Sequence, residues 1–208
     1  MSIKIDVIDQ LVGIVPGSSL DLIRRRRGQA RDNAQASFDA LFAPATPGEV
    51  SRIERLAVAA FVAGLTGEPA TASFYLAEPA RLGAATGEAV GRELAQGRTK
   101  GPYGRYPDGP LSHETVAGPV YEPDAAAREA LGTRLAAAFR HAHLLVLHPR
   151  DAAPADLQAL LDAGWTTPSI VTLSQIIAFV SFQSRVVAGL IALNATAAEP
   201  RSEEAAHV

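Results

Sequence analysis

The chain of 208 residues contains no cysteine, only one methionine and one tryptophan, and 6% aromatic residues in all. Without a thiol it forms no disulfide and holds no metal through thiolates. It also has no thiolate to attack the O–O bond of a peroxide, so thiol-dependent redox chemistry is excluded. The scarcity of aromatic residues, together with segments rich in alanine and leucine, favours helices over sheets. We therefore predict an all-α fold.

The chain also lacks an excess of charge of one sign and a long uninterrupted apolar run. Its formal net charge is -3 and its pI is about 6.0, which gives no basis for nucleic acid as a partner. No run reaches the ~18 to 20 apolar residues that cross a bilayer, and residues 1–13 lack a cationic segment before an apolar stretch. We expect a cytoplasmic protein with no membrane partner.

Signatures of cofactor and metal sites are absent from the sequence as well. It contains no Gly-x-x-x-x-Gly-Lys or Gly-x-Gly-x-x-Gly loop, no Gly-x-Ser-x-Gly elbow and no His-Glu-x-x-His. His141 and His143 lie two residues apart in an expected helix, so their rings point to different sides and a shared metal is not expected. We expect no cofactor and no metal.

Apolar periodicity and breaks at proline or glycine predict about eight helices in a single domain that spans residues 1–208. An N-terminal group (1–82) contains the first four helices, and an irregular excursion (83–123) contains one more. A C-terminal group (124–194) contains three, followed by a flexible tail (195–208). The expected helices cover residues 6–15, 18–42, 51–65, 69–82, 86–96, 124–147, 154–164 and 169–193.

Three of these segments have an unusual composition. Arg24 to Arg27 form a basic run, but consecutive helical residues diverge by ~100°, so we expect the run to be mostly solvated rather than to bind an anion. The helix over 169–193 is apolar around most of its circumference, which predicts burial in the core or at a subunit interface, and hence a homo-oligomer. In the excursion, Tyr103, Tyr106 and Tyr121 either pin a surface loop or pack over a neighbouring subunit or the mouth of a pocket.

Two stretches carry a family resemblance. Residues 51–75 (SRIERLAVAAFVAGLTGEPATASFY) form an expected helix, a stop and the start of the next helix. Residues 155–185 (ADLQALLDAGWTTPSIVTLSQIIAFVSFQSR) end a short helix at Ala-Gly and continue into a long one. Both stretches resemble the alkylhydroperoxidase D-like and carboxymuconolactone decarboxylase superfamily, particularly its peroxidase-related branch. The resemblance implies an alkylhydroperoxidase D-like helical bundle.

The same resemblance shows which functional residues of the family are missing. The family places Glu-Arg-Glu at the start of one helix and Cys-x-x-Cys-x-x-x-His at the next helix junction. Here residues 54–56 read Glu-Arg-Leu, and Glu68, Thr71 and Tyr75 stand where the two cysteines and the histidine would be. The family's Phe-Asn-x-x-Asn-Arg ending becomes Val-Ser-Phe-Gln-Ser-Arg, which keeps only the arginine, Arg185. The family's thiol peroxidase activity is therefore not expected.

Glu68, Thr71 and Tyr75 are the first candidate site residues. At i, i+3 and i+7 they share one helix face, where a carboxylate, a hydroxyl and a phenol can act as acid, base or donor if a pocket shifts their pKa values. The alternative is structural. Glu68 then satisfies the helix N-terminus, Thr71 is an ordinary first-turn residue and Tyr75 is a core aromatic.

Glu54, His141 and Arg185 are the candidate neighbours of this site. His141 could meet Glu54 or Glu68 across the fold. Arg185 lies in an apolar helix and needs a partner for its charge if it is buried. Glu54 is the candidate partner for a structural ion pair, and the alternative is that Arg185 binds the carboxylate of a substrate.

Three functions remain open. The first is a catalytically silent scaffold that assembles as a homo-oligomer and serves a partner such as an active peroxidase-like relative. The second is a thiol-independent, decarboxylase-like enzyme acting on a small carboxylated organic molecule, with a closed pocket lined by Glu68, Tyr75 and a histidine or arginine. The third is a binder of such a molecule that performs no chemistry.

Overall fold

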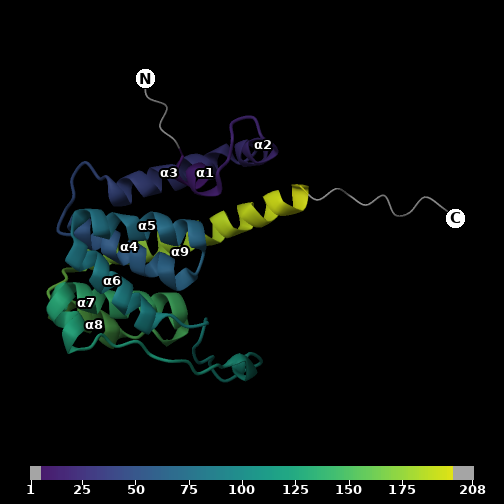
Figure 1. Cartoon of the computed structure of the whole chain (residues 1–208). Coiled ribbons are helices and arrows are strands. Elements are labelled where there is room, and N and C mark those ends of the chain that lie inside the picture. The colour runs from purple at the N-terminus through teal and green to yellow at the C-terminus, as the bar shows by residue number, and fades with distance from the viewer. Residues whose placement is uncertain (1–5, 199–208) are drawn as a thin grey trace.

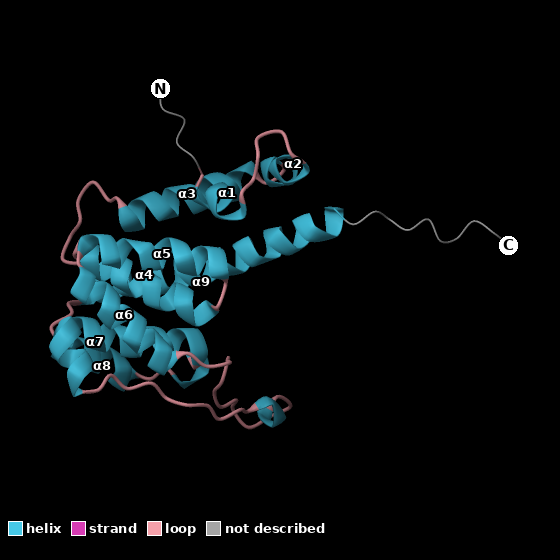
Figure 2. Ribbon diagram, in the orientation of Figure 1, coloured by secondary structure: helices cyan, strands magenta, loops and turns pink. Residues whose placement is uncertain are grey.

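The computed structural model describes residues 6–198, apart from the side chains of residues 79–82 and 197–198. Within that range the chain forms nine α-helices and two short 3-10 helices but no strand, which confirms the prediction of an all-α bundle of about eight helices (Figures 1 and 2). The α-helices are α1 (Val7–Val12), α2 (Ser19–Arg25), α3 (Gly28–Phe42), α4 (Arg52–Thr66), α5 (Pro69–Leu82), α6 (Ala84–Gly97), α7 (Ala125–Leu147), α8 (Pro154–Asp162) and α9 (Thr167–Ala198).

The helices lie in three layers (Figure 1). One outer layer contains α1, α2 and α3, the middle layer contains α4, α5 and α9, and the other outer layer contains α6, α7 and α8. Helix α4 contacts α5, α6, α7 and α9, so it is the centre of the bundle. The C-terminal part of α9 and the segment 98–123 both extend beyond the bundle on the same side (Figure 1).

The sequence of α4 accounts for its central position. Residues 56–63 are each at most 5% exposed, and the alanines among them let neighbouring helices approach closely. Ser51 and Glu54 form a capping box that begins the helix. Gly67 ends it at a φ of 74°, a left-handed conformation that favours glycine, and Pro69 then opens α5. Each large apolar side chain buried here stabilises the fold by roughly 1.5–3 kcal/mol.

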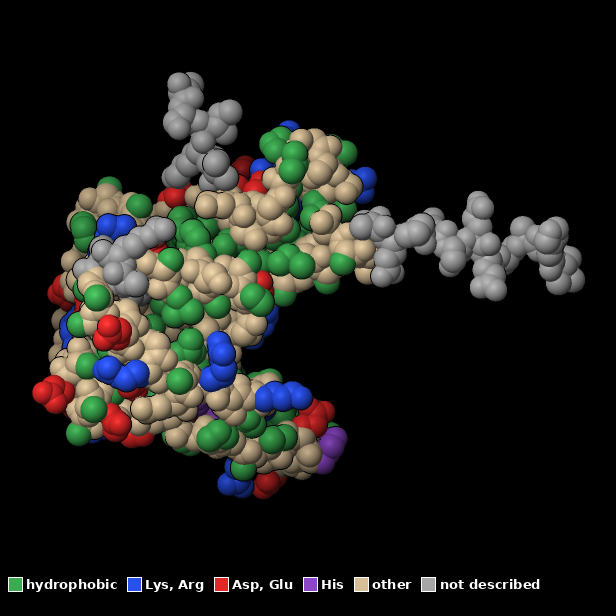
Figure 3. Space-filling model, in the orientation of Figure 1, with side chains coloured by type: hydrophobic (Ala, Val, Ile, Leu, Met, Phe, Trp, Pro, Cys, Tyr) green, Lys and Arg blue, Asp and Glu red, His purple; other side chains and the backbone are tan. Residues whose placement is uncertain are grey.

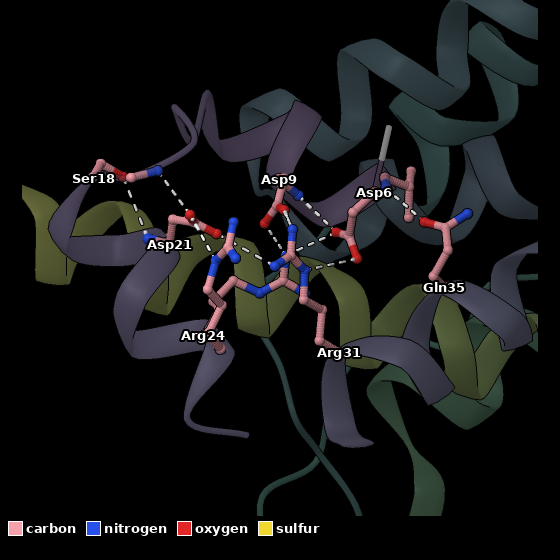
Figure 4. A network of polar contacts seen from close by, with 10 residues as sticks. Asp6, Asp9, Ser18, Asp21, Arg24, Arg31 and Gln35 are labelled. Atoms are coloured by element: carbon pink, nitrogen blue, oxygen red, sulfur yellow. Dashed lines mark hydrogen bonds and ion pairs between the residues drawn. The ribbon is translucent and has the colours of Figure 1, made fainter. Parts of the chain in front are cut away.

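The prediction of one helix over residues 18–42 is wrong. Helix α2 ends at Arg25, and Arg27 has a φ of -119° and a ψ of 52° before α3 begins at Gly28. On the two sides of the break, one arginine of α2 and one of α3 pair with three carboxylates (Figure 4). One carboxylate belongs to α1, one to α2 and one to the residue that caps α1. These partners are Arg24 and Arg31 on one side and Asp6, Asp9 and Asp21 on the other.

Arg24 therefore corrects the expectation of a solvated basic run. Arg24 is only 9% exposed, and its Nη1 donates to Asp6 Oδ1 at 2.8 Å and to Asp9. The carboxylates raise the pKa of Arg24, although burial opposes them as the largest single effect. Arg25, Arg26 and Arg27 are exposed as expected. This network, which was not predicted from the sequence, joins α1, α2 and α3.

Helix α9 runs farther than predicted and is long enough to cross a membrane. Residues 167–196 contain an 18-residue window with a mean hydropathy of 1.9, so this helix has the length and composition of a membrane span, which the lack of a long apolar run had not led us to expect. Of the most apolar window, 39% is buried inside the bundle. Helix α9 continues to Ala198, and the rest of the expected tail, residues 199–208, lies outside the described residues.

The excursion after α6 folds back against the end of α7. Tyr103 N donates to Leu147 O at 2.6 Å, and the ring of Tyr103 packs 5.2 Å from that of His148. Tyr121 is 6% exposed, with its ring 5.4 Å from that of Phe61 in the core. Tyr103 and Tyr121 thus anchor the segment at both ends, and this fixes the position of residues 98–102 beside α4 and α9.

Candidate functional site

Glu68 lies at the junction of α4 and α5 and caps α5. It is 7% exposed, and its two carboxylate oxygens accept hydrogen bonds from Ala70 N at 3.0 Å and Thr71 N at 2.7 Å. The positive end of the helix dipole stabilises the carboxylate there. The negative charge of Glu68 is therefore compensated by the backbone, as the structural interpretation expects.

Thr71 and Tyr75 are completely buried and point into the core. Tyr75 Oη donates to Gln183 Oε1 at 2.7 Å, and burial raises the pKa of Tyr75. Thr71 Oγ1 and Gln183 Nε2 are buried without a hydrogen-bond partner among the described residues. Glu68 thus precedes the helix that contains Thr71 and Tyr75, and of these three residues only Glu68 lines the groove described next.

An open groove lies beside Glu68 instead. Its volume is about 450 Å³, and it lies between the end of α4, the segment 98–102, the end of α7 and the middle of α9. The apolar part of its lining comes from Leu65, Pro102, Val146, Leu147 and Ala188. Figure 3 shows this side of the molecule as a notch with Lys and Arg side chains on its wall.

Three cations line this groove. Arg98, Lys100 and Arg185 are all exposed and belong to its lining, whereas Glu68 is the one carboxylate among the lining residues. Arg98 Nη2 makes a long hydrogen bond of 3.3 Å to Gly64 O. Because the charge of Glu68 is already engaged by two backbone N–H groups, the groove has an excess of positive charge.

Hydroxyl groups from two elements complete the groove next to Glu68. The hydroxyl oxygens of Thr66 and Ser184 lie 2.9 Å apart, one at the end of α4 and the other on α9. Thr99 also lines the groove, and its Oγ1 lies 2.8 Å from Tyr103 Oη. The groove therefore offers cations and hydroxyls around an apolar floor.

The predicted ion pair between Glu54 and Arg185 is wrong. Glu54 Oε1 accepts from Arg134 Nε at 2.6 Å, and Arg185 Nη1 donates to Ser181 O of its own helix at 2.9 Å. Glu54 is in the first turn of α4 while the groove lies at the other end, about 18 Å of helix rise away. Arg185 is exposed, so its charge needs no buried partner and is free to meet a ligand.

His141 does not join the groove either. It is 4% exposed, and neither ring nitrogen has a hydrogen-bond partner among the described residues. Burial lowers the pKa of His141, so the imidazole is neutral at pH 7. Of the six predicted site residues, the structure brings only Glu68 and Arg185 together around one groove.

A second polar cluster on α6, α7 and the excursion was not predicted. Tyr121 Oη donates to the carboxylate of Glu93, which is 2% exposed, and burial together with Glu93 raises the pKa of Tyr121. His143 Nε2 lies 3.1 Å from Gly97 O, and burial lowers the pKa of His143 to about 4. A neutral His143 therefore donates through Nε2 to the carbonyl.

His148 links this cluster to the excursion. Its Nδ1 lies 3.1 Å from Asp151 Oδ2 and its Nε2 lies 3.0 Å from Pro119 O. The cavity beside His143 and His148 has a volume of only about 60 Å³, which suits a few water molecules rather than an organic ligand. Of these contacts only that between His148 and Asp151, three residues apart, is local in the sequence, because Gly97 and Pro119 lie about 30 to 50 residues from the histidines that they contact.

The residues that the structure describes contain no group of three or more His, Asp or Glu side chains arranged to hold a metal ion. Comparison of the chain with family models, with curated proteins and with solved structures finds no match.

Proposed function

We propose that this protein binds a small organic carboxylate in the groove beside Glu68, as a cysteine-free relative of the alkylhydroperoxidase D-like superfamily without thiol peroxidase activity. The observation that carries the proposal is the placement of Arg98, Lys100 and Arg185 around an apolar floor. The groove volume of about 450 Å³ lies within the range of small-molecule sites.

Electrostatics supports an anionic ligand. Arg185 donates only to a backbone carbonyl among the described residues, so its guanidinium has donors left for a carboxylate. A ligand with an apolar body would cover Val146 and Leu147 while its carboxylate meets the cations at the rim. A purely structural scaffold gives no reason for three cations to line one apolar groove.

The hydrogen bonding and burial of the candidate acid and base groups favour ligand binding without catalysis. Both oxygens of Glu68 accept backbone hydrogen bonds, and Tyr75 is buried with its pKa raised. A general acid or base must reach the substrate within hydrogen-bond distance. Neither residue presents a free group of that kind to the groove.

The proposal is tested by calorimetric titration and thermal shift with pairs of aromatic and aliphatic carboxylates and their neutral primary amides. Carboxylates are expected to bind and to raise the melting temperature, because a ligand selective for the native state stabilises it. Loss of the charged contact in Arg185→Gln should weaken binding roughly tenfold to a hundredfold.

Arg92→Gln is the matched control, since Arg92 is an exposed arginine of α6 outside the groove lining. It should leave affinity unchanged. Equal binding of carboxylates and amides, or equal losses in the two variants, would contradict the proposal. Turnover of a bound carboxylate would reassign the groove to an enzyme.

A further inference from the structure

Helix α9 has a second face that no other helix of the described chain covers. Six exposed residues follow one another along it at intervals of four, three, four, three and four: Val171, Gln175, Ala178, Phe182, Arg185 and Gly189. That spacing is the coiled-coil repeat, which keeps residues on one narrow stripe. Val171 is 52% and Phe182 is 47% exposed. We call these six residues the α9 seam.

The opposite face of α9 is the core of the bundle. Leu173, Ile176, Val180 and Val187 are completely buried there. The seam is therefore an exposed stripe on a helix whose other face is fixed in the core, and it extends over about 27 Å of helix rise. It contains one charged residue, Arg185, and one amide, Gln175.

We propose that a second copy of this chain pairs with α9 along the seam in the antiparallel direction, about a two-fold axis between Ala178 and Phe182. The axis places three kinds of pair in register, each formed twice. They are Phe182 with the partner's Ala178, Arg185 with the partner's Gln175, and Val171 with the partner's Gly189.

The residues of each pair are complementary in size or polarity. A phenylalanine faces an alanine and a valine faces a glycine, so the large side chain finds space at the small one. A Cβ built on Gly189 meets no atom within 4 Å, so the surface there is open. The guanidinium of Arg185 is matched by the amide oxygen of a glutamine, which accepts a hydrogen bond from it.

The parallel arrangement lacks this complementarity. It would oppose Arg185 with Arg185 and Phe182 with Phe182, and like charges in a seam are destabilising. A lipid surface is also a poorer occupant, because Gln175 and Arg185 lie inside the stripe and the other face of the helix is committed to the bundle. The small flanking residues Ser174 and Ser181 leave room for a second helix to approach.

Sedimentation velocity tests the pairing. The wild-type chain is expected to sediment as a dimer at micromolar concentration, and Phe182→Lys as a monomer with an unchanged circular dichroism spectrum. Val120→Lys is the matched control, because Val120 is 75% exposed on the excursion, and it should remain dimeric. A wild-type chain that stays monomeric, or a Phe182→Lys variant that stays dimeric, would overturn the proposal.

The absence of cysteine permits a direct test of direction. Val171→Cys and Gly189→Cys, each the single thiol of its chain, are treated with a short bis-maleimide separately and after mixing. Antiparallel pairing predicts a covalent dimer only in the mixture. Cross-linking of each variant with itself would overturn the antiparallel direction, and binding of the wild type to phosphatidylcholine vesicles with loss of self-association would assign the seam to a lipid surface.

Discussion

Tyr75 and Gln183 join α5 to α9 inside the core through one hydrogen bond of 2.7 Å. Thr71, one turn earlier on α5, is equally buried but its hydroxyl has no partner among the described residues. The hydroxyl of Tyr75 should therefore stabilise the fold, whereas the unpaired hydroxyl of Thr71 should destabilise it. Both residues occupy positions where the family resemblance places functional residues. Both side chains are packed in the core, and only Tyr75 satisfies a buried polar group.

Tyr75→Phe is expected to destabilise the protein by about 1–3 kcal/mol, because it leaves the buried Gln183 amide oxygen without a donor. Thr71→Val is the matched variant and should be neutral or stabilising, since it replaces an unsatisfied hydroxyl by a methyl group of the same shape. Urea unfolding of both variants measures the difference. Equal destabilisation by the two substitutions would show that the hydroxyl of Thr71 is also satisfied.

The buried histidines predict a stability that depends on pH. The pKa of His143 falls from 6.5 to about 4 on folding because burial disfavours the imidazolium. The unfolded chain then binds the proton first, so stability is full above pH 6.5 and decreases as the pH falls towards 4. Urea unfolding across that range should show that the free energy of unfolding decreases as the pH falls. In His143→Gln this slope should be smaller, by an amount that corresponds to at most one bound proton. His113→Gln, at an exposed position, should keep the wild-type slope.

At the scale of single helices, local signals in the sequence were sufficient for most boundaries. The capping box of Ser51 and Glu54, the left-handed Gly67 and the prolines Pro69 and Pro154 mark the ends of helices through their own conformational preferences. The break between α2 and α3 has a different cause. The arginines on its two sides, Arg24 and Arg31, pair with Asp6 and Asp9, which lie outside residues 18–42.

The ion-pair network makes the outer layer sensitive to one arginine. Arg24→Gln removes the more buried of the two cations at Asp6 and Asp9 and leaves only Arg31 to pair with them, so it should destabilise the chain by about 1–3 kcal/mol. Arg26→Gln is an exposed neighbour and should change stability by less than about 0.5 kcal/mol. Thermal unfolding of the two variants compares them. A small and equal effect would mean that the network contributes little to holding α1, α2 and α3 together.

At the scale of the whole molecule, the groove arises from the tertiary fold. Glu68 and Arg185 were candidate residues in the sequence, although Arg185 was expected to pair with Glu54, whereas Arg98 and Lys100 reach the groove only because the excursion is anchored at Tyr103 and Tyr121. The apolar periodicity of the helices does not predict that the excursion packs back against the bundle. Arg185 belongs to both the groove and the α9 seam, so self-association would bring the partner's Gln175 near the rim of the groove.

The most direct test of the proposed function is a crystal structure of the protein grown with the carboxylate that gives the largest thermal shift. We predict electron density in the groove, with the carboxylate within hydrogen-bond distance of the Arg185 guanidinium and the apolar body against Val146 and Leu147. A ligand bound elsewhere, or a groove filled by its own side chains, would contradict the proposed function.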